Sequence, residues 1–249
     1  MVGFVSTTAT VARLLTFATM RQTDSPGDES RSQALARRTV TESPEFAEQA
    51  AAGDWYPALG EPLAIELANT LFSDGGRPVD ALTTPAALTR WLDANADAID
   101  APLPRRPSAE DLNRARQLRT IIRALLGNAV DHDAPPAATV RRLNQLAALA
   151  PFTAQLHWTA HQPPEAHLSL SGAGRFDALL ALVAQSAIDV LGGSGAGRLR
   201  RCEAPGCINY YLKDHPRRAW CSPRCGNRVR VARHYHRTRR GTANSTEHD

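Results

Sequence analysis

All four cysteines of this 249-residue chain lie within one 24-residue window. They form two short-spaced pairs, thirteen residues apart: Cys202, Cys207, Cys221 and Cys225. Two pairs of thiolates at such spacing can converge on a single tetrahedral zinc ion. An iron–sulfur cluster and redox thiols are the alternatives, although a redox pair favours C-x-x-C, which is absent. The spacing therefore predicts a zinc site.

The residues beside the cysteines support this prediction. Gly206 allows the backbone to turn just before Cys207, so that both sulfurs of the first pair face inward. Ser222 suits a helix N-cap and Pro223 the first turn, which places Cys225 at a helix N-terminus that stabilises a thiolate.

Four thiolates complete a tetrahedral set and leave no open coordination position. We therefore expect structural rather than catalytic zinc, and a module of about 40 residues needs the metal's stabilisation in order to fold. Three histidines could replace a ligand but are better interpreted as surface groups: His215, His234 and His236.

A basic helix is predicted after Cys225, from Gly226 to about Arg240. Val229, Ala232 and either Tyr235 or His236 form a narrow apolar stripe at helical spacing. Arginines occupy most of the remaining surface, and we predict nucleic-acid contacts through Arg224, Arg228, Arg230, Arg233, Arg237, Arg239 and Arg240. Arg228 has a rival role in packing against the zinc loop. A solvated helix face and a surface for an acidic protein are the alternatives.

Positive charge is concentrated at this end of the chain. The whole chain carries a net charge of +4. Residues 198–240 hold thirteen Lys and Arg but two carboxylates, a net +11, so the remainder carries −7. This distribution predicts a polyanionic partner for the C-terminal end alone.

The sequence contains no run of about 18 uncharged apolar residues, so we expect no membrane span. The N-terminus has no basic residue before Arg13 and no small-residue cleavage site, which is atypical of a signal peptide. We therefore expect a cytoplasmic protein, in which reducing conditions keep the thiols available for metal. Met20 is an alternative initiator to Met1.

Upstream of the cysteines, the sequence predicts a mainly helical body with a small antiparallel hairpin. The alternation of Leu63, Ile65 and Leu67 indicates a short strand or extended segment, followed by a turn through residues 73–78. Thr84 and Pro85 are typical of a helix start. The apolar face of that helix would be Leu88, Trp91 and Leu92.

Ser108 and Asp111 resemble a capping box at the start of a second helix. Apolar residues then recur at helical spacing: Leu112, Ala115, Leu118, Ile122, Leu125, Leu126 and Ala129. Four arginines fall mostly off this stripe, which predicts a solvated face: Arg114, Arg116, Arg119 and Arg123.

A third helix is predicted over about residues 137–149, and a hairpin follows. Its apolar face would be Leu156, Trp158, Leu168 and Leu170. A mostly apolar helix then runs to Gly192 and should be central.

The organisation we predict is a flexible segment at residues 1–45, a body at 46–191, a Gly-rich joint at 192–197, the module at 198–240 and a disordered tail at 241–249. We expect the body to fold without the module.

We expect no enzymatic activity. The body shows no nucleophile elbow, phosphate-binding loop, dinucleotide fingerprint or zinc-protease motif. Its candidate acids are single carboxylates without an evident partner: Asp54, Glu61 and Glu66. Three histidines near the hairpin are better interpreted as surface groups than as ligands: His157, His161 and His167.

Residues 225–228, "CGNR", together with Trp220-Cys221, the earlier C-x4-C and the following "VRVARHYHR", resemble the CGNR zinc-finger module. That module is usually found after a domain called ABATE, and "LAIELANTL" resembles the opening of that domain. The resemblance covers roughly residues 55–240. The second pair departs from many members, which have one more residue between these cysteines.

Proteins of this family are described as stress-induced transcription regulators of bacteria. The resemblance implies a regulator whose zinc module contacts DNA while the body senses a small molecule or mediates assembly. The alternative is a zinc-stabilised adaptor that binds RNA or an acidic protein surface.

Overall fold

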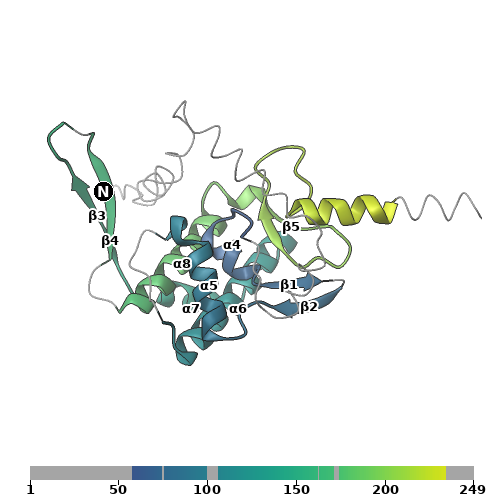
Figure 1. Cartoon of the computed structure of the whole chain (residues 1–249), viewed down its shortest axis with the longest axis horizontal. Coiled ribbons are helices and arrows are strands. Elements are labelled where there is room, and N and C mark those ends of the chain that lie inside the picture. Colours follow the sequence, from purple (N-terminus) through teal and green to yellow (C-terminus); the bar gives the residue numbers. More distant parts are fainter. Residues whose placement is uncertain (1–57, 75, 100–105, 162, 171–173, 234–249) are drawn as a thin grey trace, which may run out of the picture. The chain divides into compact units, whose positions relative to one another are not determined.

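The computed structural model describes residues 58–74, 76–99, 106–161, 163–170 and 174–233. The predictions for residues 1–45, Asp54 and 241–249 lie outside these ranges. The described chain is mainly helical with short antiparallel strands, as predicted. The helices of the body are α4 (Leu63–Ala68), α5 (Pro85–Ala94), α6 (Ala109–Asp131), α7 (Ala137–Ala147) and α8 (Arg175–Gly192), and a further helix lies near the C-terminal end of the described residues (Figure 1).

The central position predicted for the last of these helices is confirmed. α8 packs against α4, α6 and α7. The side chains of Leu180, Ala184 and Ala187 along it are at most 2% exposed. No helix within the described ranges is both long and apolar enough to cross a membrane.

Leu63, Ile65 and Leu67 lie in a helix, so the predicted strand is wrong. α4 begins after Pro62, and all six of its residues are buried. A helix buried on every side has no polar face, and so the sequence carries no helical period. Glu66, a carboxylate with no evident partner in the sequence, is 1% exposed. Its carboxylate accepts the backbone N–H groups of Leu59 and Glu61 at 2.7 and 2.8 Å.

The segment after α4 forms a hairpin, where the sequence indicated a turn alone. Strands β1 (Leu71–Asp74) and β2 (Arg77–Asp80) pair antiparallel, with Leu71 opposite Asp80 and Asp74 opposite Arg77. The strands are short and largely half-exposed, so no apolar alternation marks them.

The predicted helix caps are confirmed. Thr84 Oγ1 accepts the Ala87 N–H at 3.1 Å, and Pro85 is the first helical residue of α5. Ser108 and Asp111 form a reciprocal capping box at the start of α6. The predicted apolar face of α5 is buried, as is that of α6 apart from the exposed Ala129.

The arginines of α6 are not a solvated face. Arg119 is 6% exposed and donates two hydrogen bonds to the carboxylate of Asp80, at 2.5 and 2.7 Å, and a third to Thr70 Oγ1. These bonds lower the pKa of Asp80, although burial opposes them. α6 is thus enclosed on its arginine side by the end of α4 and by the β1–β2 hairpin.

Arg123 is half-buried and also contacts neighbouring segments on that side. Its guanidinium donates to the carbonyls of Ala68, Leu71 and Ile208 at 2.8, 3.0 and 3.1 Å. The other two arginines of α6 also have partners. Arg114 forms an ion pair with Asp177. Arg116 donates hydrogen bonds to the carbonyls of Leu82 and Thr83.

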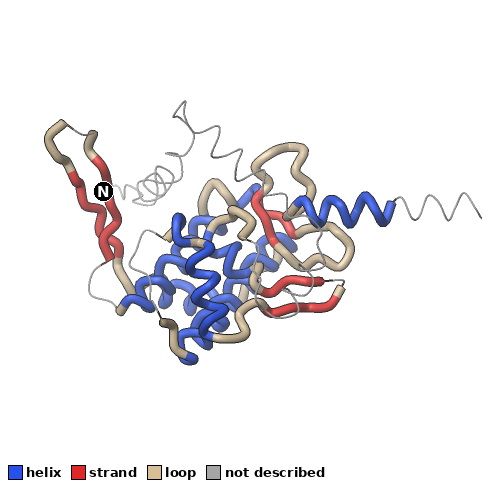
Figure 2. Tube along the Cα trace, viewed as in Figure 1, coloured by secondary structure: helices blue, strands red, loops and turns tan. Residues whose placement is uncertain are grey.

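The predicted hairpin is confirmed as β3 (Phe152–His157) and β4 (Glu165–Leu170), with Ala154 opposite Leu168 (Figure 2). Its predicted apolar face does not pack at Leu156 and Trp158, which are 68% and 70% exposed. Trp158 lies beyond the end of β3. His157 and His161 are exposed, as expected.

The chain passes from α8 into the module through residues 193–198. η2 (Ala196–Arg198) leads to β5 (Leu199–Arg201), which pairs antiparallel with β6 (Tyr210–Leu212). Leu199 and Tyr210 are 4% and 6% exposed and belong to the same apolar core as the helices of the body. The module therefore shares the body's core, and independent folding of residues 46–191 stays a prediction.

Candidate metal centre

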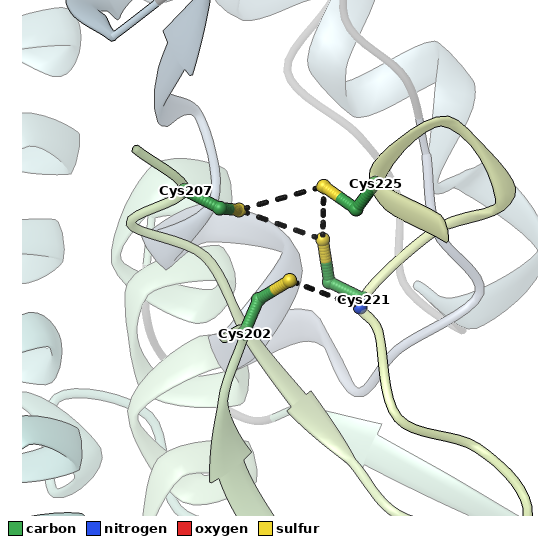
Figure 3. Close-up of side chains that lie close together, drawn as sticks. All are labelled: Cys202, Cys207, Cys221 and Cys225. Atoms are coloured by element: carbon green, nitrogen blue, oxygen red, sulfur yellow. Dashed lines mark hydrogen bonds between the residues drawn. The ribbon is translucent and has the colours of Figure 1, made fainter. Parts of the chain in front are cut away.

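The four cysteine sulfur atoms form one cluster, in which all lie within 4.8 Å of one another (Figure 3). The Sγ atoms are 3.8 Å apart for Cys207 and Cys221, 3.5 Å for Cys221 and Cys225, and 3.7 Å for Cys207 and Cys225. A tetrahedral ion with sulfur ligands at about 2.3 Å requires sulfur–sulfur edges of about 3.8 Å. The donor set and its dimensions therefore fit zinc.

The first pair is positioned by the β5–β6 strands and a tight turn. The Cys202 N–H donates to the Asn209 carbonyl at 2.9 Å, which extends the strand pairing. The Cys207 N–H donates to the Ala204 carbonyl at 2.9 Å. Gly206 has φ +71°, a left-handed conformation that favours glycine. The expected role of this glycine is thus borne out by the backbone.

The second pair lies at a helix start, as predicted. The described helical residues are 223–233, and this segment is the basic helix. Ser222 Oγ accepts the Cys225 N–H at 3.3 Å, which is an N-cap bond. Cys225 therefore lies in the first turn, where the helix dipole favours negative charge.

Arg228 supplies a second source of positive charge to this ligand. Its Nη2 donates to Cys225 Sγ at 3.2 Å. Burial lowers the pKa of Arg228, but the adjacent Cys225 thiolate outweighs burial and raises it overall. The pKa of Cys225 is in turn lowered by hydrogen bonds from the other three thiols. This contact supports the rival role predicted for Arg228, next to the metal ligands.

A partly buried ion pair joins the segment before Cys221 to the body. The Arg218 guanidinium contacts the Glu61 carboxylate, and their side chains are 24% and 3% exposed. Arg218 also donates to the carbonyls of Leu212 and Cys221 at 3.1 and 3.3 Å, and its guanidinium lies 5.0 Å from the centroid of the Tyr211 ring. Glu61, which looked unpartnered in the sequence, thus has a structural partner 157 residues away.

A second polar contact between body and module involves Asn69. Its side-chain amide donates to the Tyr210 carbonyl and accepts the Tyr210 N–H, both at 2.9 Å. Asn69 is 2% exposed, so this reciprocal pair satisfies backbone groups that water does not reach.

The β1–β2 hairpin contacts the segments that carry both cysteine pairs. A Cβ atom at Gly206 would lie 3.2 Å from Gly76 Cα, so the two turns meet backbone to backbone. Asp74 accepts a hydrogen bond from Arg224 at 2.6 Å, one residue before Cys225. These contacts join segments far apart in sequence, and no local signal indicates them.

The arginines predicted to bind nucleic acid fall into distinct groups. Arg224 pairs with Asp74, and Arg228 lies against Cys225. Arg230 and Arg233 are exposed, and within the described ranges neither makes an ion pair. Residues Arg237, Arg239, Arg240, His234 and His236 lie outside the described ranges, and His215 is an exposed residue of the loop before Cys221.

Two family models match the chain in succession. The ABATE model, described as "Putative stress-induced transcription regulator", matches residues 61–194, more than half of the chain. The CGNR zinc finger model matches residues 198–238 and includes all four cysteines. A comparison with curated proteins gives no match. The chain therefore belongs to the ABATE family and ends in a CGNR zinc finger whose four clustered cysteines are the zinc-binding site.

Proposed function

We propose that this protein is a cytoplasmic transcription regulator that binds duplex DNA through the basic helix. The observation that carries the proposal is the exposure of Arg230 and Arg233 on a helix that Cys225 fixes to the zinc centre. The sequence has no carboxylate between Asp214 and Glu247. Phosphate groups are the partner that such a surface favours.

The zinc has a supporting role in this proposal. Four thiolates hold the start of the helix against β5 and β6, and leave no coordination position for a substrate. We therefore propose a binding protein rather than an enzyme.

The body would act on DNA binding through its contacts with the module. Glu61, Asn69 and Asp74 each contact a residue of the zinc finger. A ligand or a second subunit that moves α4 or the β1–β2 hairpin would therefore change the position of the basic helix. We propose that this is how the body regulates the module.

The test is a salt titration of duplex DNA binding with zinc-loaded protein. Arg233→Ala should weaken binding to all duplexes similarly and reduce the slope of log affinity against log salt by about 0.9. Arg141→Ala, which removes an exposed arginine of α7 in the body, should leave the slope unchanged. Equal slopes for both variants would contradict the proposal. Preference for structured RNA in a competition assay would favour the adaptor alternative.

A further inference from the structure

The paired strands β5 and β6 have one face toward the body and one toward the zinc centre. Residues opposite each other in an antiparallel pair project on the same side, and successive residues alternate. Leu199 and its partner Leu212 pack with the apolar core of the body. Tyr211, the partner of Arg200, packs instead with the cysteine cluster. Arg200 therefore lies on the zinc side of the strands.

A second cation shares this side with Arg200. The Lys213 N–H donates to the Arg198 carbonyl at 2.8 Å, which extends the strand pairing by one residue beyond Leu212. Because Lys213 lies two residues after Tyr211, its side chain projects on the same side, as a diagonal neighbour of Arg200. Arg200 is exposed and Lys213 is half-buried. We define the strand face as Arg200 and Lys213.

Neither cation of the strand face forms an ion pair within the described ranges. Arg200 Nη1 donates to the carbonyls of Gly197 and Leu199 at 2.9 and 2.7 Å. These neutral acceptors hold the guanidinium in place but do not compensate its charge. The edge formed by Nε and Nη2 is left to donate two parallel hydrogen bonds, the geometry that matches two oxygens of one phosphate.

Arg201, the next residue of β5, has the opposite arrangement. It lies on the body side, where it pairs with Asp131 at 2.8 Å, and its guanidinium lies 5.8 Å from the centroid of the Tyr210 ring. The body thus supplies a carboxylate to the arginine that faces it. Of these two neighbours, Arg200 alone keeps an uncompensated charge, on the zinc side.

The basic helix carries a cation on the same side. Val229 is 7% exposed and packs with the cysteine cluster. Arg233 lies one turn later, rotated by about 40° from Val229, and is exposed. Arg233 therefore projects from the side of the helix that faces the cysteine cluster, which is the cluster that Tyr211 contacts from the strands. A DNA backbone is long enough, and uniformly charged enough, to pass from one element to the other.

We propose, resting on the DNA-binding function above, that Arg200 and Lys213 bind phosphates beside the DNA segment that the basic helix contacts. Arg200 binds one phosphate through its Nε–Nη2 edge, and Lys213 neutralises a neighbouring phosphate as a point charge. The zinc finger then contacts a duplex with two elements. The strand face fixes the orientation of the helix on the duplex and carries no base preference.

The experiment uses the full chain, loaded with zinc, and a duplex enriched from a randomised library. Arg200→Ala and Lys213→Ala should each reduce the slope of log affinity against log salt by about 0.9. Arg201→Ala is the matched control from the other face of β5 and should leave the slope unchanged. Arg200→Lys should keep the slope but bind less tightly, because an ammonium group cannot donate the two parallel bonds.

Replacement of each phosphate in turn by an uncharged methylphosphonate locates the contacts. The wild type should lose roughly tenfold in affinity at the phosphate that contacts Arg200, the effect of one charge-assisted hydrogen bond. Arg200→Ala should be insensitive to replacement at that position, and Arg233→Ala at a different one. The Lys213 side chain makes no hydrogen bond within the described ranges, so Lys213→Ala should keep the wild-type zinc content and urea midpoint.

Two outcomes would overturn the strand-face proposal while DNA binding stands. One is an unchanged salt slope for Arg200→Ala and Lys213→Ala together with the reduced slope of Arg233→Ala. The other is an equal reduction for Arg201→Ala, because the effect would then not depend on the face of the strands. Failure of the wild type to bind any duplex would overturn both proposals.

Discussion

Arg218→Ala tests whether the zinc finger and the body are one folding unit. The substitution removes the cation that faces the carboxylate of Glu61, and this carboxylate is 3% exposed. It also removes the hydrogen bonds to the carbonyls of Leu212 and Cys221. The zinc ligands themselves remain.

The expected loss of stability is large for one surface-adjacent residue. Removal of one partner from a buried ion pair costs about 3–5 kcal/mol. Arg218 is 24% exposed, so water can partly reach the site, and we expect a cost near the lower limit, about 3 kcal/mol. A loss of this size would lower the melting temperature of a domain of 150–250 residues by roughly 6–12 °C.

The assay is urea unfolding of zinc-loaded protein, with the loss of stability calculated from the midpoint at unchanged slope. Arg217→Ala is the matched control, because Arg217 is the adjacent exposed arginine, and it should cost less than about 0.5 kcal/mol. In a Glu61→Gln background, Arg218→Ala should cost less by about 1–3 kcal/mol. A penalty for Arg218→Ala no larger than that for Arg217→Ala would refute the reasoning.

The same pair predicts a pH dependence. Burial raises the pKa of Glu61 above 4.5, and Arg218 partly offsets this rise. The folded protein thus binds the proton more tightly than the unfolded chain, so the stability from this group is present below about pH 4.5 and is lost as pH rises through the folded pKa. Arg218→Ala raises that pKa further, so its penalty should increase between pH 5 and pH 8. The Glu61→Gln background should abolish the increase.

Three further substitutions test the metal centre. Elemental analysis of the wild type should find about one zinc per chain, and Cys221→Ser should lose it; full zinc content in the variant would contradict the four-thiolate site. Arg228→Ala should weaken zinc binding ten- to a hundredfold in a chelator competition, because the residue donates to a ligand sulfur, whereas Arg230→Ala should not. Gly206→Ala should cost about 1–2 kcal/mol in urea unfolding, because its φ of +71° and the adjacent turn backbone disfavour a Cβ. Gly197→Ala, with open space around it, should have little effect.

The features that the sequence predicts well are those encoded by neighbouring residues. Thr84, Ser108 and Ser222 each cap the helix that follows, because a hydroxyl oxygen needs only the N–H groups two or three residues later. The cysteine spacing likewise predicts the tetrahedral sulfur cluster, since two short loops can each present two sulfurs to one ion.

The features that escaped prediction depend on distant residues. The position of Arg119 in the helical pattern is the same whether its side chain contacts water or a carboxylate. The contact with Asp80 arises from the tertiary fold alone. Glu61 and Arg218 are 157 residues apart. α4 was assigned wrongly because burial on all sides removes the polar face by which a helix is recognised. The contacts of Asn69 with Tyr210 and of Asp74 with Arg224 likewise join residues far apart in the sequence.

The shared core has a consequence for chimaeric proteins. The CGNR finger is not a portable cassette, because Leu199 and Tyr210 would become a solvent-exposed apolar patch on residues 198–240 alone. Arg218 would also lose its counter-ion. A transplant of this finger onto another protein would therefore have to include α4 and the β1–β2 hairpin, which supply its buried contacts.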